Sequence, residues 1–261
     1  MNKLELNSAS LLKDLVENYG VLGIKTSFED EGASFNEVLR LKELCNQAST
    51  KLLLKISGAE AKRDLADSRI IGVKGIVAPM IESAFALDKF VKSTKSILPS
   101  DILSNVQLGI NIETVSAYKN FKEMLNSDGF NSLHHITFGR VDFISSMNKD
   151  RSYVNSKEMF DIATDIFTQS REKTKKVYLG GAVTTDSEDF MKNLFNKGLL
   201  DKFETRYVIY DPAIALKNLK EALLMGQKLE LGILRNRQQE NLRESNKEFQ
   251  RIEMIAKRVG E

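Results

Sequence analysis

Two carboxylates in this sequence come at points where an apolar run gives way to polar residues. Glu113 ends the run LGINIE, and Asp142 follows the run ITFGRV. Two carboxylates held close together repel each other unless a cation lies between them. Oxygen ligands favour a hard divalent ion, Mg²⁺ or Mn²⁺, with water or substrate as the remaining ligands. The pair therefore predicts a metal site. The alternative is that each carboxylate caps a helix, as Asp142 could before the segment FISSM.

Short apolar runs alternate with longer amphipathic segments, and this alternation would bring the two carboxylates together. The runs cover residues 21–25, 51–57, 75–80, 106–113, 133–139, 176–182 and 203–211, with a possible short one at 3–6. Continuous apolar strands between helices are typical of a buried parallel sheet. Eight such units predict an α/β fold, a (β/α)8 TIM barrel, in which the carboxyl ends of the strands carry the site. The rival, an open doubly wound sheet, lacks support from a dinucleotide-binding glycine motif or a Walker loop.

Lys55 lies near the end of another apolar run, KLLLKIS, which is predicted to reach the same face. A buried ammonium group is costly unless it has a partner. We expect Lys55 to neutralise an enolate oxygen as a cation or, if its pKa is lowered, to form a Schiff base. The alternative is a lysine whose charged end reaches solvent at the barrel mouth.

Other polar residues end or follow the predicted strands: Glu29, Glu31, Glu82, Asn111, Gly139 and Arg140. Gly139 and Arg140 lead into a short helical segment, and the free backbone N–H groups of a helix N-terminus suit a substrate carboxylate. We expect the first two residues of the set to transfer protons and the other four to contact substrate.

The composition is that of an ordinary globular protein and gives no sign of a nucleic acid or membrane partner. The 261 residues include 38 basic and 36 acidic side chains, for a net charge of +2. No apolar run approaches the roughly 18 residues of a membrane span, so we expect a cytoplasmic protein. The single cysteine, Cys45, excludes an intrachain disulfide and a cysteine-based zinc cluster. The two histidines, His134 and His135, come early in their strand, so we expect packing or hydrogen-bonding roles and no Ser–His–Asp triad.

The pattern changes after Pro212, where helix-favouring residues dominate. Apolar residues recur in the later part at Leu242, Phe249, Ile252, Ile255 and Val259. Their spacing predicts one long helix with a narrow apolar stripe. Such a helix is marginal alone in water, so we expect it to pack on the barrel or on another subunit, and we favour a homo-oligomer. The chain then divides into a barrel domain, residues 1–225, and a C-terminal helix, residues 226–261.

Three strings carry a resemblance to a known family: GIVAPMIESAFAL, GINIETVSAY and TFGRVDFISSM, in this order. Together they resemble the HpcH/HpaI aldolase and citrate lyase β-subunit family. The resemblance implies a (β/α)8 barrel that binds Mg²⁺ or a similar ion and makes or breaks carbon–carbon bonds beside a 2-oxo acid or an acyl thioester. By motif match, Glu113 and Asp142 look like the metal pair, the Gly139–Asp142 turn like the carboxylate-binding loop, and Asn111 like a residue of the metal shell. Many members also exchange a C-terminal helix between subunits.

Two positions depart from the family's pattern. Lys55 stands where the family usually has an arginine, so the charge is kept but the forked geometry is lost. The first loop, KTSFEDEGAS, lacks the family's histidine, which leaves Glu29 or Glu31 as the base. The strings FEDEG and KISGAEAKRDL resemble a subgroup associated with polysaccharide genes, which implies a sugar-derived aldehyde.

These observations predict a metal-dependent class II aldolase that acts on pyruvate, or another 2-oxo acid, and an aldehyde. Mg²⁺ or Mn²⁺ on Glu113 and Asp142 would stabilise the enolate as a Lewis acid, and Lys55 would add positive charge. Two alternatives stay open. One is a citrate-lyase-like enzyme for an acyl thioester, which would need a groove for coenzyme A or an acyl carrier. The other is a non-catalytic barrel that serves as a binding or assembly module.

Overall fold

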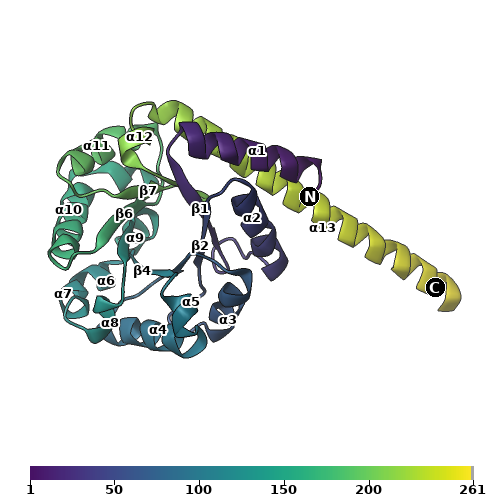
Figure 1. Ribbon diagram of the computed structural model, residues 1–261, viewed down its shortest axis with the longest axis horizontal. Coiled ribbons are helices and arrows are strands. Elements are labelled where there is room, and N and C mark those ends of the chain that lie inside the picture. The colour runs from purple at the N-terminus through teal and green to yellow at the C-terminus, as the bar shows by residue number, and fades with distance from the viewer. Residues whose placement is uncertain (260–261) are drawn as a thin grey trace.

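The computed structural model describes residues 1–259 and shows a closed barrel of eight strands, surrounded by helices and extended by one long helix (Figure 1). The strands are β1 (Val21–Ser27), β2 (Lys51–Lys55), β3 (Gly75–Ala78), β4 (Gln107–Ile112), β5 (His135–Gly139), β6 (Lys176–Gly180), β7 (Lys202–Glu204) and β8 (Val208–Tyr210). Strands β1 to β7 pair in parallel, whereas β8 is antiparallel to both neighbours, β7 and β1. The predicted (β/α)8 barrel with a C-terminal helical extension is confirmed.

Helices cover the outside of the barrel. They are α1 (Lys3–Asn18), α2 (Phe35–Gln47), α3 (Lys62–Ile71), α4 (Ala84–Ile97), α5 (Ser100–Leu103), α6 (Val115–Lys119), α7 (Phe121–Met124), α8 (Asp128–Asn131), α9 (Arg140–Ser146), α10 (Lys157–Glu172), α11 (Glu188–Asn196), α12 (Pro212–Ala215) and α13 (Leu219–Val259), with the 3₁₀ helices η1 (Arg151–Asn155) and η2 (Thr185–Ser187) among them. None of the helices within residues 1–259 is both long and apolar enough to cross a bilayer.

Alternate residues of each strand point to opposite sides of the barrel wall. One set is fully buried in the layer shared with the helices and includes Leu52, Leu54, Ile76, Ile110 and Ile136. The other set faces the barrel interior. Lys25 on β1 and Glu204 on β7 form an ion pair of 2.5 Å although β8 lies between their strands, so both side chains project inside. The interior is therefore polar where it approaches the mouth of the barrel.

The apolar run at residues 3–6 is helical, so its assignment as a strand is wrong. Asn2 and Glu5 form a reciprocal cap, in which Asn2 Oδ1 accepts from the Glu5 N–H at 3.0 Å and Glu5 Oε2 accepts from the Asn2 N–H at 2.7 Å. This capping box starts α1. Further along α1, Leu12 and Leu15 are fully buried.

The eighth strand comes instead from the run at residues 203–211, which is two strands and not one. The chain reverses between β7 and β8, where the Thr205 N–H donates to Val208 O at 2.9 Å and the Val208 N–H donates to Thr205 Oγ1 at 3.1 Å. Because β8 runs back from the mouth, α12 and α13 begin at the opposite end of the barrel. Helix α13 then runs along the outside toward the mouth.

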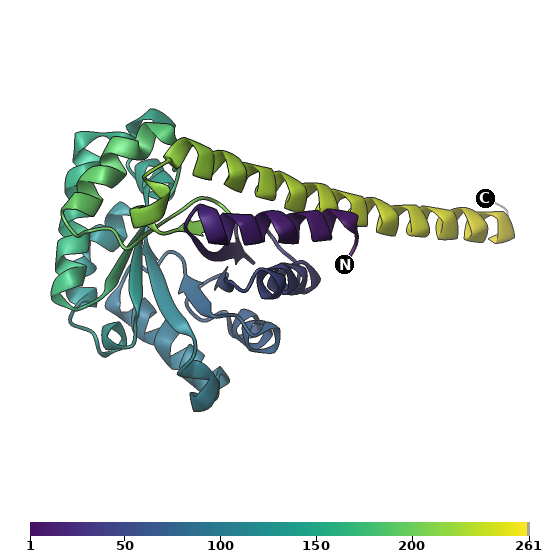
Figure 2. The same ribbon diagram turned by 45° about the horizontal axis from the view of Figure 1, so that its top comes forward.

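Helix α13 packs antiparallel to α1 over its first half. Tyr19 Oη donates to Glu221 Oε1 at 3.3 Å near one end of this contact, and Asn2 Nδ2 donates to Asn236 Oδ1 at 2.6 Å near the other. Beyond α1 the helix projects away from the barrel (Figures 1 and 2). Helix α13 therefore spans the boundary predicted at residue 225, and residues 260 and 261 of the predicted second domain lie outside the described residues.

Candidate active site

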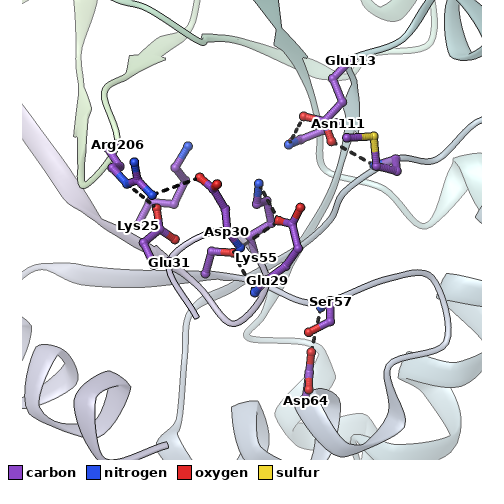
Figure 3. A network of polar contacts seen from close by, with 12 residues as sticks. Lys25, Glu29, Asp30, Glu31, Lys55, Ser57, Asp64, Asn111, Glu113 and Arg206 are labelled. Carbon is purple, nitrogen blue, oxygen red and sulfur yellow. Dashed lines mark hydrogen bonds and ion pairs between the residues drawn. The ribbon is translucent and has the colours of Figure 1, made fainter. Parts of the chain in front are cut away.

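Glu113 is the first residue after β4, and its carboxylate is held inside the mouth with only 2% of the residue exposed. Glu113 Oε1 accepts from the Met80 N–H at 2.9 Å, and Glu113 Oε2 accepts from Asn111 Nδ2 at 3.0 Å (Figure 3). Gly139, at the end of β5, leaves the space that this carboxylate occupies. A Cβ atom on Gly139 would lie 2.8 Å from Glu113 Oε2 and 2.9 Å from Glu113 Cβ. The glycine in the string TFGRVD is thus required by the close approach of Glu113.

Asp142 lies in the first turn of α9, three residues after Gly139. The helix is capped by Gly139 without a side-chain hydrogen bond, so the alternative in which Asp142 is the N-cap is wrong. Burial raises the pKa of Asp142, and the positive charge of Lys55 opposes that rise. Burial also raises the pKa of Glu113, and the negative charge of Asp142 adds to the rise. Each carboxylate is therefore less acidic than usual, because the effect of burial outweighs that of the nearby positive charge.

Lys55 ends β2 and forms an ion pair with Glu29 of the first loop, with 2.8 Å between Lys55 Nζ and Glu29 Oε2. Burial alone would lower the pKa of Lys55, but the hydrogen bond to Glu29 and the charge of Glu113 outweigh it and raise the pKa. The ammonium form is therefore stabilised. Of the two roles expected for Lys55, the cation is the one that this environment favours, because a Schiff base requires the neutral amine.

The first loop follows β1 and is fixed by several short contacts (Figure 3). Ser27 Oγ accepts from the N–H groups of Glu29 at 3.0 Å and Asp30 at 2.9 Å. Glu31 Oε1 lies 3.1 Å from Arg206 Nε, while Glu31 Oε2 is buried without a hydrogen-bond partner in the described part of the chain. Burial raises the pKa of Glu31, and the charge of Asp30 adds to this effect. Glu29 therefore contacts Lys55, whereas Glu31 contacts the β7–β8 turn.

A second lysine–carboxylate pair lies inside the mouth and was not predicted as part of the site. Lys25 Nζ is 2.5 Å from Glu204 Oε1. Gly180, at the end of β6, leaves room for Glu204, since a Cβ on Gly180 would lie 3.2 Å from Glu204 Oε1. One feature of the sequence could have indicated this pair: Lys25 lies two residues before the end of its strand, at a position that faces the barrel interior.

The Arg140 side chain is fully buried and binds other parts of the protein. Its guanidinium donates to Gly181 O at 2.8 Å and to Asn155 Oδ1 at 2.7 Å, and stacks over the Phe190 ring with 4.9 Å between the Arg140 Cζ and the ring centroid. Burial lowers the pKa of Arg140 to about 10. Its side chain thus holds the loop after β6, and the backbone of Arg140 remains at the start of α9.

Glu82 lies beside the site and joins two of its loops, since Glu82 Oε1 accepts from Thr114 Oγ1 at 2.5 Å. The histidines lie at the far end of β5, as predicted. His134 Nδ1 accepts from the Leu108 N–H at 3.0 Å, and His135 is buried against the Tyr178 ring with 4.3 Å between ring centroids.

The donor atoms at the mouth fit a hard divalent cation. Glu113 and Asp142 supply carboxylates, and the buried Asn111 Oδ1 has no hydrogen-bond partner among the described residues. Residues 1–259 contain no group of three histidine, cysteine, aspartate or glutamate side chains placed to hold a metal. Mg²⁺ often uses only one or two carboxylates and keeps water or substrate as its other ligands. The site is also rich in negative charge: the carboxylates of Glu29, Asp30, Glu31, Glu113, Asp142 and Glu204 lie near three cations, Lys25, Lys55 and Arg206.

Residues 42–195 match the profile of the HpcH/HpaI aldolase/citrate lyase family. This segment contains Lys55, Glu113 and Asp142, whereas the first loop precedes it. Among curated proteins, no sequence gives a significant match to the chain.

Solved structures show the same architecture at low sequence identity. The HpcH/HpaI aldolase from Desulfitobacterium hafniense DCB-2 is 12% identical, with a TM-score of 0.61 over 76% of this chain and 81% of that chain. An HpcH/HpaI aldolase/citrate lyase family protein from Burkholderia cenocepacia J2315 is 11% identical, with a TM-score of 0.62 over 93% and 92% of the two chains. The citrate synthase SbnG is 14% identical, with a TM-score of 0.61 over 85% and 89%. At these identities the likeness concerns the fold.

Proposed function

Because the chain belongs to the HpcH/HpaI aldolase/citrate lyase family, we propose that it is a divalent-metal-dependent class II aldolase acting on pyruvate or another 2-oxo acid. The observation that carries this proposal is the placement of Glu113 and Asp142 at one mouth of the barrel, with Lys55 beside them. Both carboxylates have a pKa raised by burial, and a bound cation would relieve that cost. A metal-free binding module would have no need to hold the buried Glu113 carboxylate close to a second carboxylate, that of Asp142.

The chain's own residues suit the reaction at three points. Mg²⁺ or Mn²⁺ held by Glu113, Asp142 and Asn111 would supply Lewis-acid chemistry at the carboxylate and keto oxygens of the 2-oxo acid. The Lys55 ammonium, kept charged by Glu29, offers positive charge to the enolate oxygen that develops as the carbon–carbon bond breaks. The first N–H groups of α9 have no partner within the helix, and such groups favour a carboxylate.

We assign the proton transfer to Glu29, with Glu31 as the second candidate. Glu29 contacts Lys55 directly and is about one-third exposed, so it can exchange protons with both the site and solvent. The Glu31 side chain is 5% exposed and paired with Arg206, which suits a role in holding the loop. The second substrate in this scheme is an aldehyde, with sugar-derived aldehydes as the first class to test.

Exchange of the methyl protons of pyruvate in D₂O tests this proposal without knowledge of the aldehyde. Proton NMR should show C3 deuteration that requires Mg²⁺ or Mn²⁺, stops with EDTA, and falls by at least about 100-fold in Glu113→Gln or Asp142→Asn. Glu172→Gln, an exposed carboxylate at the end of α10, is the matched control and should exchange like the wild type. Metal-independent exchange that survives Glu113→Gln would refute the mechanism. Absence of any exchange would favour the non-catalytic barrel.

We also propose a homo-oligomer formed through α13. Exposed apolar side chains continue along the projecting half of this helix, with Leu242 57%, Phe249 61% and Ile252 62% exposed. A helix without tertiary contacts is marginal in water, and burial of this stripe against a second copy would stabilise it. Analytical ultracentrifugation should show an oligomer for the full chain, and Phe249→Glu/Ile252→Glu should dissociate it. A monomeric wild type at tens of micromolar would contradict the proposal.

A further inference from the structure

The first loop is connected to α13 by a residue far away in the sequence. Arg237 Nη2 donates to Glu31 O at 3.2 Å, across 206 residues of chain. The same guanidinium pairs through Nε with Glu37, which lies in the first turn of α2. Arg237 therefore binds both the loop and the helix that follows it. About one-third of its side chain is exposed, so the contact lies at the edge of the site.

Arg206 holds the loop from the other side. Its Nε is 3.1 Å from Glu31 Oε1, and its Nη2 is 3.5 Å from Asp30 Oδ2. Arg206 lies in the turn between β7 and β8 and pairs with Glu31 (Figure 3). Because Arg237 lies on α13, two separate elements converge on Glu31. The side chain of Glu31 is bound by one arginine, and its backbone carbonyl by the other.

This double attachment fixes Glu29, which lies two residues earlier. The loop returns to the barrel wall through the Phe28 N–H, which donates to Lys55 O at 3.1 Å, and the Ala33 N–H, which donates to Ser27 O at 3.2 Å. Between these anchors only a few residues remain, so the attachment of Glu31 and the bonds from the Glu29 and Asp30 N–H groups to Ser27 Oγ together set where Glu29 meets Lys55. Release of Glu31 would let the Glu29 carboxylate, already one-third exposed, move into solvent.

We propose that Arg237 is a positioning residue, through which the docking of α13 on the barrel sets the Glu29–Lys55 pair. Helix α13 then has two roles along its length: its first half orders the first loop, and its projecting half carries the apolar stripe. The effect expected on catalysis rests on the proposed aldolase function, whereas the effect expected on the order of the first loop does not.

Arg237→Gln tests the proposal, with Arg243→Gln as the matched control. Arg243 lies six residues further along the same helix and, within the described part of the chain, pairs only with Glu240, at 3.0 Å. Hydrogen exchange at the amides of Phe28, Glu29, Asp30 and Ala33 should rise about ten-fold in Arg237→Gln and stay unchanged in the control. Limiting acetic anhydride should acetylate Lys55 several-fold faster in Arg237→Gln, as read by mass spectrometry. Arg237→Lys should give amide exchange and acetylation rates between those of Arg237→Gln and those of the control.

A kinetic readout separates positioning from general stability. In the pyruvate exchange assay, Arg237→Gln should lower kcat about ten-fold with KM changed about two-fold or less, because Glu29 and not pyruvate binding is disturbed. Unchanged loop exchange and unchanged Lys55 acetylation would overturn the proposal. If wild-type protein exchanges no pyruvate protons, the proposed aldolase function fails, and the loop and acetylation measurements still decide the role of Arg237.

Discussion

Replacing Gly139 by alanine should disable the proposed metal site by adding a single methyl group. That methyl would lie 2.8 Å from Glu113 Oε2 and 2.9 Å from Glu113 Cβ, closer than carbon contacts allow. Glu113 cannot retreat without loss of its hydrogen bonds from the Met80 N–H at 2.9 Å and from Asn111 Nδ2 at 3.0 Å. The backbone conformation itself allows alanine, because φ of Gly139 is −93°.

The expected magnitude follows from these contacts. Overpacking at a buried site costs about 1–3 kcal/mol, which in a chain of this size lowers Tm by about 2–4 °C per kcal/mol. Mutation of a residue that supports a metal ligand typically costs about 10–100-fold in metal affinity. Gly139→Ala should therefore unfold several degrees below the wild type and bind Mn²⁺ at least about ten-fold more weakly.

Thermal unfolding in EDTA and Mn²⁺ titration followed by electron paramagnetic resonance measure these two effects. Gly58→Ala is the matched control, because no atom lies within 4 Å of a Cβ at that position. It should unfold at the wild-type temperature or slightly above it. In a Glu113→Gly background both close contacts disappear, and Gly139→Ala should then cost less than about 0.5 kcal/mol. If Gly139→Ala matched the wild type in both Tm and Mn²⁺ affinity, the argument that Glu113 lies against Gly139 would be wrong.

Three further predictions concern charge at the mouth. Lys55→Met should lower the pyruvate exchange rate about 100-fold, whereas Lys55→Arg, which keeps the charge, should retain at least about one-tenth of it; equal losses would point to a Schiff-base lysine. The folded-state pKa values of Glu113 and Asp142 are raised. The stability that these two carboxyl groups contribute is therefore fully present below their ordinary pKa and is lost as the pH rises through the raised values. Differential scanning calorimetry should therefore show that Mn²⁺ raises Tm more at pH 7 than at pH 5, and an equal rise would contradict this. Lys25→Met should destabilise the protein by about 3 kcal/mol in urea unfolding, because Glu204 is left buried without its partner, and Lys25→Met/Glu204→Gln should recover part of that loss; no recovery would show that the pair is not coupled.

The barrel could be predicted from the sequence because its strands are buried on both faces and read as continuous apolar runs. The eighth strand could not be placed, for two local reasons. Leu4 and Leu6 alternate with polar residues as in a strand, yet the capping box of Asn2 and Glu5 makes that segment helical. The turn between β7 and β8 carries no glycine, proline or asparagine and is closed by the hydroxyl of Thr205, so its composition does not mark it as a turn.

The candidate site was predictable to the extent that it depends on strand ends. Glu113, Asp142 and Lys55 follow from the rule that parallel strands present their carboxyl ends at one face. The pairing of Lys25 with Glu204 depends on closure of the barrel, which brings side chains together across the interior. The contact of Arg237 with the first loop depends on the path of α13, and no local pattern records it. The structural role of the Arg140 side chain could not be predicted either, because it depends on the guanidinium turning toward the loop after β6.

A crystal structure with Mn²⁺ and pyruvate tests the central claim most directly, namely that Glu113 and Asp142 hold a divalent cation for a 2-oxo acid. We predict an anomalous scattering peak between these two carboxylates, with the pyruvate carboxylate at the start of α9 and its keto oxygen toward Lys55. Pyruvate joined covalently to Lys55, or Mn²⁺ bound away from Glu113 and Asp142 while pyruvate occupies the mouth, would contradict it.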